Sequence, residues 1–159
     1  MGVSGSGKTT LGEALAAHLN WPFIEGDAFH PKANVDKMAS GQPLDDQDRA
    51  PWLLALADEL RKSEARGENS ILGCSSLKRA YRDILRSGAP NVRFLHVHGD
   101  RSLLEERLSH RAGHFFPAKL LDSQLATLEP LAADEDGVVT DLALSVPEQV
   151  IDAVKKLNL

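Results

Sequence analysis

The feature that most constrains this chain is a complete G-x-x-x-x-G-K-[ST] pattern at its start. Glycines at this spacing let the backbone curl until consecutive N–H groups face one point. The helix that follows adds the positive end of its dipole, so an anion binds there favourably. In this motif the lysine reaches the β- and γ-phosphates of a nucleotide and the hydroxyl binds Mg²⁺. The pattern predicts these nucleotide contacts, with Thr9 as the metal ligand: Gly2, Val3, Ser4, Gly5, Ser6, Gly7, Lys8, Thr9 and Thr10.

The motif normally follows a β-strand, and here only Met1 precedes it. In a parallel sheet that strand is usually central. The sequence therefore predicts a sheet whose first strand is missing or truncated in this chain. A flexible glycine-serine leader ahead of an ordinary helix is the alternative interpretation of the same residues.

Composition narrows the class of protein. A chain of 159 residues suits one domain, with 42% hydrophobic and 26% charged residues. A net charge of -5 argues against nucleic acid as a partner. No apolar run approaches the roughly 18 residues that cross a bilayer. Cys74 is the single cysteine, which fits a reducing compartment. We expect a cytoplasmic enzyme with small-molecule substrates, no nucleic acid and no membrane.

Short apolar runs alternate with helical patterns, which predicts an α/β fold with a largely parallel sheet. Expected strands are 22–25, 70–74 (buried), 92–97 and 137–142. Expected helices are 10–19, one starting at Pro31 and ending near Gly41, 47–66 with Pro51 in its first turn, one capped by Ser75 or Ser76, 100–111, 120–128, and one opened by the capping box at 145–148.

Two groups of polar residues follow expected strands. Asp27 and His30 come after the first expected strand, where a carboxylate could accept a hydroxyl proton and an imidazole could bind a polar substrate. Ser75, Lys78 and Arg82 are spaced to share one helix face, where a pair of cations fits an anionic substrate. A turn aspartate, a solvent-facing histidine and a solvated basic face are the alternatives.

Arg107 and Arg111 lie one helical turn apart, just before a Gly113-His114-Phe115 break. Arginines leading into a glycine hinge suit a lid that closes over phosphates and excludes water. We therefore expect a lid around 107–124 within a single P-loop domain spanning 1–159. An ordinary surface helix would carry the same arginines.

A phosphate loop alone leaves kinases, ATPases and GTPases open. The chain lacks the Asn-Lys-x-Asp guanine signature, and no aspartate ends the 71–74 strand. Longer runs are more informative, and together they closely resemble gluconokinase of the small P-loop type. The runs are 1–9, 26–31, 37–49, 51–53, 74–78, 81–83, 111–116, 123–124 and 128–130, in order along almost the whole chain.

The resemblance implies transfer of the ATP γ-phosphoryl group to the 6-hydroxyl of D-gluconate, for the pentose phosphate or Entner-Doudoroff route. It implies a three-layer fold like that of nucleoside monophosphate kinases, with strand order 2-3-1-4-5, Mg²⁺, and often a homodimer. Gluconate is a polyol with one carboxylate. The expected catalytic residues are Lys8, Asp27, Arg82 and Arg111; the expected substrate contacts are Asp27, His30, Arg49, Ser75, Lys78, Arg82 and His114.

Two alternatives stay open at this point. One is a related small-molecule kinase, such as a shikimate kinase. The other is a protein that binds ATP without catalysis, including a truncated and inactive homologue.

Overall fold

A computed structural model describes residues 1–110 and 118–159. The helices are α1 Lys8–Leu19, α2 Lys32–Ala39, α3 Asp46–Ala65, α4 Arg79–Arg86, α5 Arg101–Ser109, α6 Ala118–Thr127 and α7 Val146–Leu157, with a 3-10 helix η1 at Gly26–Phe29. The strands are β1 Phe23–Glu25, β2 Ile71–Gly73, β3 Phe94–His98 and β4 Gly137–Asp141. The alternation of strands and helices confirms the predicted α/β class.

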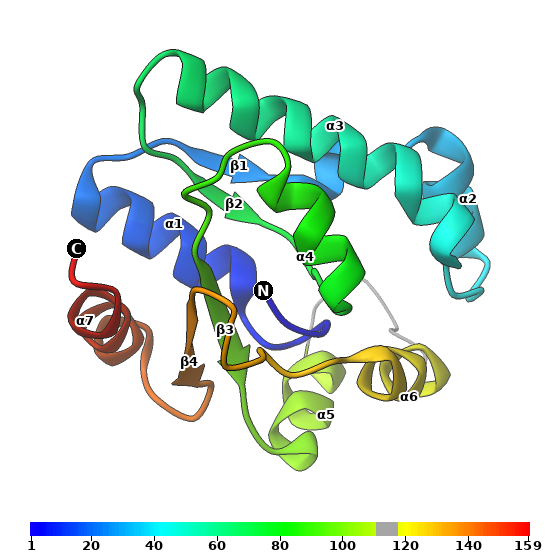
Figure 1. The fold of residues 1–159 in the computed structure, drawn as a ribbon. Helices are drawn as coiled ribbons and strands as arrows, with labels where there is room; N and C mark the ends of the chain where they lie inside the picture. The colour runs from blue at the N-terminus through cyan, green and yellow to red at the C-terminus, as the bar shows by residue number, and fades with distance from the viewer. Residues whose placement is uncertain (111–117) are drawn as a thin grey trace.

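All strand pairs in the described chain are parallel, but they form two separate two-stranded sheets. β1 pairs with β2, with Phe23 opposite Ile71. β3 pairs with β4, with Phe94 opposite Gly137. The amino terminus lies between β2 and β3 (Figure 1). There the N–H of Val97 donates to the carbonyl of Met1 at 2.9 Å. The four strands follow the expected order, with Met1 alone in the central position.

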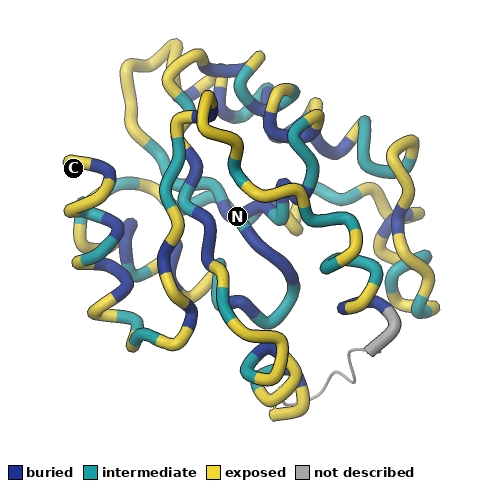
Figure 2. The backbone as a smooth tube through the Cα atoms, turned by 60° about the horizontal axis from the view of Figure 1, so that its bottom comes forward, coloured by how far each residue is buried: buried dark blue, intermediate teal, exposed yellow. Residues whose placement is uncertain are grey.

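Helices cover both faces of these sheets, which gives three layers (Figure 1). One core contains leucines of α1, α5 and α6 and the inner face of α7; the other lies under α3 and α4 and includes Trp52 and Phe94. Figure 2 shows the buried residues along the strands and the inner helix turns, with the outer turns exposed. In the described part of the chain, no helix is both long and apolar enough to span a membrane.

Local sequence explains most helix boundaries. Asp45 and Asp48 form a capping box that starts α3, and Ser145 and Glu148 form the predicted one at α7. Gly41 and Gly67 follow α2 and α3 with positive φ, at 77° and 65°.

Three predicted details are wrong. Pro51 is the sixth residue of α3 rather than in its first turn. β2 is mostly half-buried, because among the described residues it pairs with a strand on one edge only. α4 starts at Arg79 with Lys78 as its N-cap, because Ser76 takes a left-handed conformation with φ 46° and cannot enter the helix.

Candidate active site

The phosphate loop has the conformation that its glycines predict. Gly2, Gly5 and Gly7 have φ values of 144°, 82° and 92°, which L side chains rarely adopt. Gly5 also needs its small size, since a Cβ there would lie 2.8 Å from the Cγ of Leu108. Gly7 caps α1, so the positive end of that helix faces the loop.

The reactive groups of the loop are held by local hydrogen bonds. The ammonium of Lys8 donates to the carbonyl of Val3 at 3.0 Å. The hydroxyl of Thr9 donates to Glu25 Oε2 at 2.8 Å. Ser6 is fully buried, and its hydroxyl has no hydrogen-bond partner among the described residues. Hydroxyl and carboxylate oxygens side by side are the donors Mg²⁺ prefers, so Thr9 and Glu25 fit this metal.

Two later segments contact the loop. Arg107 in α5 donates to the carbonyls of Ser6 at 3.5 Å and of Leu142 at 2.6 Å. Gln124 in α6 accepts from the N–H of Ser4 at 2.7 Å and donates to its hydroxyl at 3.1 Å. The structure thus brings the arginine predicted from the lid pattern, and a glutamine not predicted for the site, to the same loop.

Asp27 and His30 lie on and just after η1, at the carboxyl end of β1. The side chain of Asp27 is 73% exposed and that of His30 only 4%, and His30 Nε2 lies 4.0 Å from Asp27 Oδ1. His30 stacks on Trp52 with ring centroids 4.1 Å apart. Burial lowers the pKa of His30, with Asp27 opposing the shift and Arg49 adding to it. An imidazole whose charged form is disfavoured by burial thus lies beside an accessible carboxylate.

Side chains of α3 and β1 hold the backbone at Gly26 and Asp27 in place. The indole N–H of Trp52 donates to the carbonyl of Gly26 at 2.8 Å. The N–H of Asp27 donates to Glu25 Oε1 at 3.3 Å, and the other oxygen of Glu25 accepts from Thr9. Glu25 therefore connects the phosphate loop directly to the Asp27 segment.

A second group of polar side chains surrounds an open pocket of about 550 Å³. Lys78 contacts both oxygens of Asp46, at 2.7 and 2.9 Å, and the Tyr81 hydroxyl donates to the same carboxylate. These bonds lower the pKa of Asp46 and raise that of Lys78. The pocket is lined by Leu44, Asp45, Asp46, Gln47, Lys78, Tyr81 and Thr127.

Arg49 is near both the Asp27–His30 pair and the polar group around the pocket. Its guanidinium is 5.8 Å from the centre of the Tyr81 ring, and its charge affects the pKa of both His30 and Asp46. A cation, a carboxylate and a phenol at the pocket, with a carboxylate and an imidazole beside it, can bind a ligand that carries both hydroxyls and a negative charge.

The structure corrects the expectation for Arg82. Its side chain and that of Glu135 are both 0% exposed, and they form a bidentate pair at 2.6 and 2.8 Å. The remaining guanidinium donors bond to the carbonyls of Ser76, Leu77, Glu129 and Pro130. A guanidinium enclosed in this way holds the 129–135 segment on α4 and cannot contact a substrate. It does not share a helix face with Ser75 and Lys78, which precede α4.

Ser75 and Cys74 lie in the part of the chain that the structure describes, whereas two expected site residues do not. Ser75 is half-buried beside the phosphate loop, and its carbonyl accepts from the N–H of Gly2 at 3.1 Å. Cys74 is buried, and burial raises the pKa of its thiol, as suits a packing residue. Arg111 and His114 lie outside the described residues, and so does the centre of the expected lid.

Sequence reasoning missed Glu25, Asp46 and Gln124 as site residues. Glu25 had a usable signal, because it ends a strand two residues before Asp27. Asp46 and Gln124 lie in the 37–49 and 123–124 runs that carry the resemblance, but spacing alone gave neither a role, since both reach the site from helices distant in the sequence.

The chain is similar to known proteins along almost its whole length. A family profile described as an AAA domain matches residues 1–131. The chain is 49% identical to a gluconokinase of Gluconobacter oxydans, covering 96% of this chain and 85% of that protein. It is 48% identical to the thermosensitive gluconokinase of Escherichia coli, covering 97% of this chain and 84% of that one.

Solved structures extend the comparison. A gluconokinase from Sinorhizobium meliloti superimposes with a TM-score of 0.91 at 47% identity, over 99% of this chain and 89% of that chain. An unliganded sugar kinase from Janibacter gives 0.94 at 47% identity, over 99% and 91% of the two chains. A shikimate kinase from Aquifex aeolicus, with a TM-score of 0.62 at 16% identity, shares the fold alone.

Proposed function

The chain belongs to the gluconokinase family, and from that membership we infer that it is an ATP-dependent kinase that phosphorylates gluconate. One observation carries the inference: identity of 44 to 49% to three curated gluconokinases extends over almost the whole chain. Nothing observed favours shikimate as the acceptor, or ATP binding without catalysis.

We propose that the nucleotide phosphates bind across residues 2–10, at the amino end of α1. Lys8 would neutralise the β- and γ-phosphates, and Arg107 would add positive charge beside them. Thr9 would hold Mg²⁺, with Glu25 fixing its hydroxyl or binding a metal-bound water. Bound there, Mg²⁺ supplies charge neutralisation between the leaving and transferred phosphates.

The acceptor is the 6-hydroxyl of D-gluconate in this proposal. Asp27 orients that hydroxyl and accepts its proton as the oxygen attacks the γ-phosphorus. The bond from phosphorus to the ADP oxygen breaks, and a new bond to the gluconate oxygen forms. The exposed position of Asp27, with its N–H bonded to Glu25, supports this role because the carboxylate is open to a ligand.

We assign the carboxylate end of gluconate to Lys78 and Arg49, with His30 binding a hydroxyl. The pocket beside Lys78 supports this assignment, since the Asp46 carboxylate positions the ammonium without enclosing it. Arg82 has no place in this scheme. Ser75 is half-buried near the phosphate loop and is kept as a candidate contact through its hydroxyl.

A coupled assay of ADP release tests the reaction. D-gluconate, shikimate and AMP are compared at equal concentrations, and gluconate should be preferred by at least about a hundredfold in kcat/KM. Equal rates with shikimate would overturn the assignment. Replacement of Asp27 by Asn should lower kcat by roughly 10² to 10⁴; turnover within a few-fold of the unchanged chain would remove Asp27 from proton transfer.

Several finer expectations remain proposals. They are a single kinase domain over 1–159, a lid around 107–124 with Arg111 and His114 contacting ligands, a homodimer, and a cytoplasmic location. Arg107 supports the lid indirectly, because it joins α5 to the phosphate loop. Sedimentation would test the dimer. Protection of the 107–124 amides from hydrogen exchange by ATP and gluconate together would test the lid.

A further inference from the structure

Asn34 in α2 is a buried polar residue to which the proposed reaction gives no role. Only 5% of it is exposed. Its amide nitrogen Nδ2 donates to the backbone carbonyl of Asp48 at 2.7 Å and lies 3.4 Å from Nδ1 of His30. An amide nitrogen carries two hydrogens, so this one atom can serve both contacts. Asn34 therefore connects the backbone of α3 to the imidazole ring beside Asp27.

The carbonyl of Asp48 decides which way the Asn34 amide faces. A carbonyl oxygen only accepts hydrogen bonds, so the Asn34 atom 2.7 Å away is the nitrogen and not the oxygen. This carbonyl is itself well fixed, because Asp48 belongs to the capping box that starts α3 and its N–H donates to Asp45 at 2.9 Å. The same amide nitrogen then directs a hydrogen at Nδ1 of His30, which must be the bare, accepting nitrogen of the ring.

The other ring nitrogen agrees with this assignment. Nε2 of His30 lies 4.0 Å from Oδ1 of Asp27. A hydrogen on Nε2 is attracted by that carboxylate, whereas a lone pair facing it is repelled. Burial and the charge of Arg49 disfavour a charged ring, with Asp27 opposing them, and a protonated Nδ1 would meet the hydrogens of the Asn34 amide. Stacking on Trp52 holds the ring in this orientation. Both nitrogens therefore favour the form with its hydrogen on Nε2.

The separation of the ring from the carboxylate fits one oxygen atom that contacts both. A distance of 4.0 Å is too long for a direct hydrogen bond. An oxygen about 2.8 Å from each atom can accept from Nε2 and donate to Asp27 at the same time. A hydroxyl does both, whereas an ether cannot donate and an ammonium cannot accept. Nε2 also keeps some contact with solvent, since the fully buried side-chain atoms that lack a partner in the described chain are those of Ser6, His96 and Thr140.

We propose that Asn34 is a positioning residue: it holds His30 as the Nε2–H tautomer, so that His30 and Asp27 form a donor and an acceptor for one hydroxyl group. The proposal rests on the proposed function in one respect, namely that this hydroxyl belongs to gluconate. A ring in this form cannot take a proton from the acceptor, so of the two residues Asp27 alone can serve as the base.

Nitrogen NMR of the histidine rings tests the tautomer in the full chain without any ligand. Isotope-labelled histidine is incorporated, and long-range proton–nitrogen correlations distinguish a protonated ring nitrogen from a bare one. The spectra are recorded at about pH 8, above the ordinary histidine pKa of about 6.5. The His30 signals are those that disappear in His30→Gln. They should show a protonated Nε2 and a bare Nδ1, and a protonated Nδ1 would overturn the proposal.

Two substitutions separate the effect of Asn34 from that of Asp27. Asn34→Leu removes the long hydrogen bond to Nδ1, so the ratio of Nε2–H to Nδ1–H rings should fall about two- to fivefold. Asn34→Asp presents an acceptor instead, so Nδ1 should become protonated. Asp36→Asn, on the same helix but 61% exposed, is the matched control and should leave the ring unchanged.

The exposed ring of His18 should be the same in every spectrum. An unchanged His30 ring in both Asn34 variants would overturn the proposal. Circular dichroism establishes that each variant folds, and Asn34→Leu decides alone if Asn34→Asp does not.

Gluconate itself tests the functional part of the proposal. A ligand that accepts from Nε2 binds only the Nε2–H tautomer, so saturating gluconate should return the ratio in Asn34→Leu toward that of the unchanged chain. Bound gluconate that leaves the ratio unaltered, or that favours Nδ1–H, would overturn the donor role of His30. Failure of gluconate to bind the unchanged chain would count against the proposed function, while the ligand-free spectra still decide the role of Asn34.

Discussion

The buried pair of Arg82 and Glu135 gives the sharpest stability prediction. Both side chains are 0% exposed and joined by two short hydrogen bonds, so neither charge has water as a substitute partner. Replacing Glu135 by Leu leaves a buried guanidinium without its anion. Breaking a buried pair in this way costs about 3–5 kcal/mol. In a domain of this size, about 1 kcal/mol corresponds to roughly 2–4 °C, so the midpoint should fall by about 6–20 °C.

The measurements are urea unfolding, for the free energy, and thermal unfolding, for the midpoint, both followed by circular dichroism for the two single variants and the double variant. Arg82→Met should also be strongly destabilising, since it removes the donors to four carbonyl groups. The double variant Arg82→Met/Glu135→Leu should lose less than the sum of the two, because no uncompensated charge remains. Strict additivity, or a loss below about 1 kcal/mol for Glu135→Leu, would refute the reasoning.

A neighbouring pair supplies the control. Arg79 and Asp134 also form a bidentate contact between α4 and the same acidic segment, but their side chains are 40% and 68% exposed. Asp134→Asn should therefore leave stability almost unchanged.

The pair also predicts a pH dependence. The bond to Arg82 holds the pKa of Glu135 below its usual value of about 4.3. The contribution of the pair to the free energy of unfolding is fully present above that usual value, and it is lost as the pH falls through the lower pKa of Glu135 in the folded state. The stability difference between the unchanged chain and Glu135→Leu should be constant from about pH 7 to 5 and shrink below about pH 4.

Three further predictions concern the active site. Glu25→Gln should raise the Mg²⁺ concentration for half-maximal activity by about tenfold, since Thr9 loses a charged acceptor, and leave metal-free ATP binding by calorimetry unchanged; an unchanged Mg²⁺ dependence would contradict it. Gly5→Ala should weaken ATP binding more than tenfold and lower the free energy of unfolding by about 1–3 kcal/mol. Gly67→Ala is the control: Gly67 also has a positive φ, but a Cβ there would have no atom within 4 Å, so this variant measures the cost of the backbone conformation alone. Lys78→Met should raise KM for gluconate at least about tenfold while KM for ATP stays constant; parallel changes in both would exclude a specific role at the acceptor.

The sequence predicts best the parts of the site that are contiguous in the chain. The phosphate loop, its helix and the Asp27 segment follow from spacing and turn chemistry within some thirty residues. Arg82 shows where that reasoning fails. Periodicity placed it on a basic face, but whether a helical arginine faces water or an acid depends on Glu135, and no local pattern connects residues so far apart.

A similar limit applies to backbone conformation. A Ser-Ser pair before an apolar run is typical of a helix cap, yet the left-handed φ of Ser76 delays α4 until Arg79 and leaves Lys78 at its N-cap. This shift allows Lys78 to reach Asp46 on α3. The acidic partners of the basic residues are set by tertiary packing, and only the three-dimensional structure reveals them.

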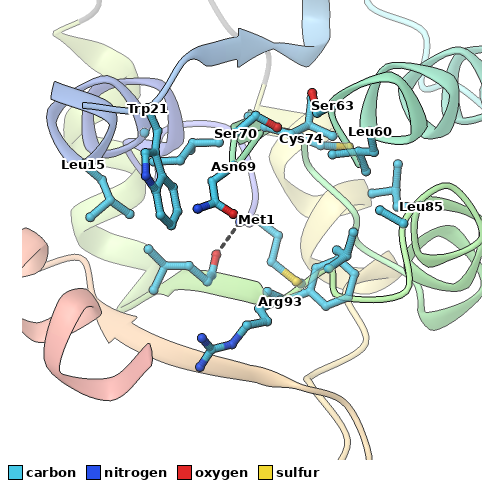
Figure 3. A pocket seen from close by; sticks show the side chains of 18 of the residues that line it. Met1, Leu15, Trp21, Leu60, Ser63, Asn69, Ser70, Cys74, Leu85 and Arg93 are labelled. Carbon is cyan, nitrogen blue, oxygen red and sulfur yellow. Dashed lines mark hydrogen bonds between the residues drawn. The ribbon is translucent and has the colours of Figure 1, made fainter. Parts of the chain in front are cut away.

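The stacking of His30 on Trp52 makes the proposed acceptor site optically observable without any added label. The chain has two tryptophans, and Trp21 lines a different cavity, of about 500 Å³, beside β2 and β3 (Figure 3). A Trp21→Phe variant therefore emits from the indole beside His30 alone, while a Trp52→Phe variant emits from the distant indole. Titrating gluconate into the first variant would follow substrate arrival, and the second variant would serve as the control whose emission stays constant.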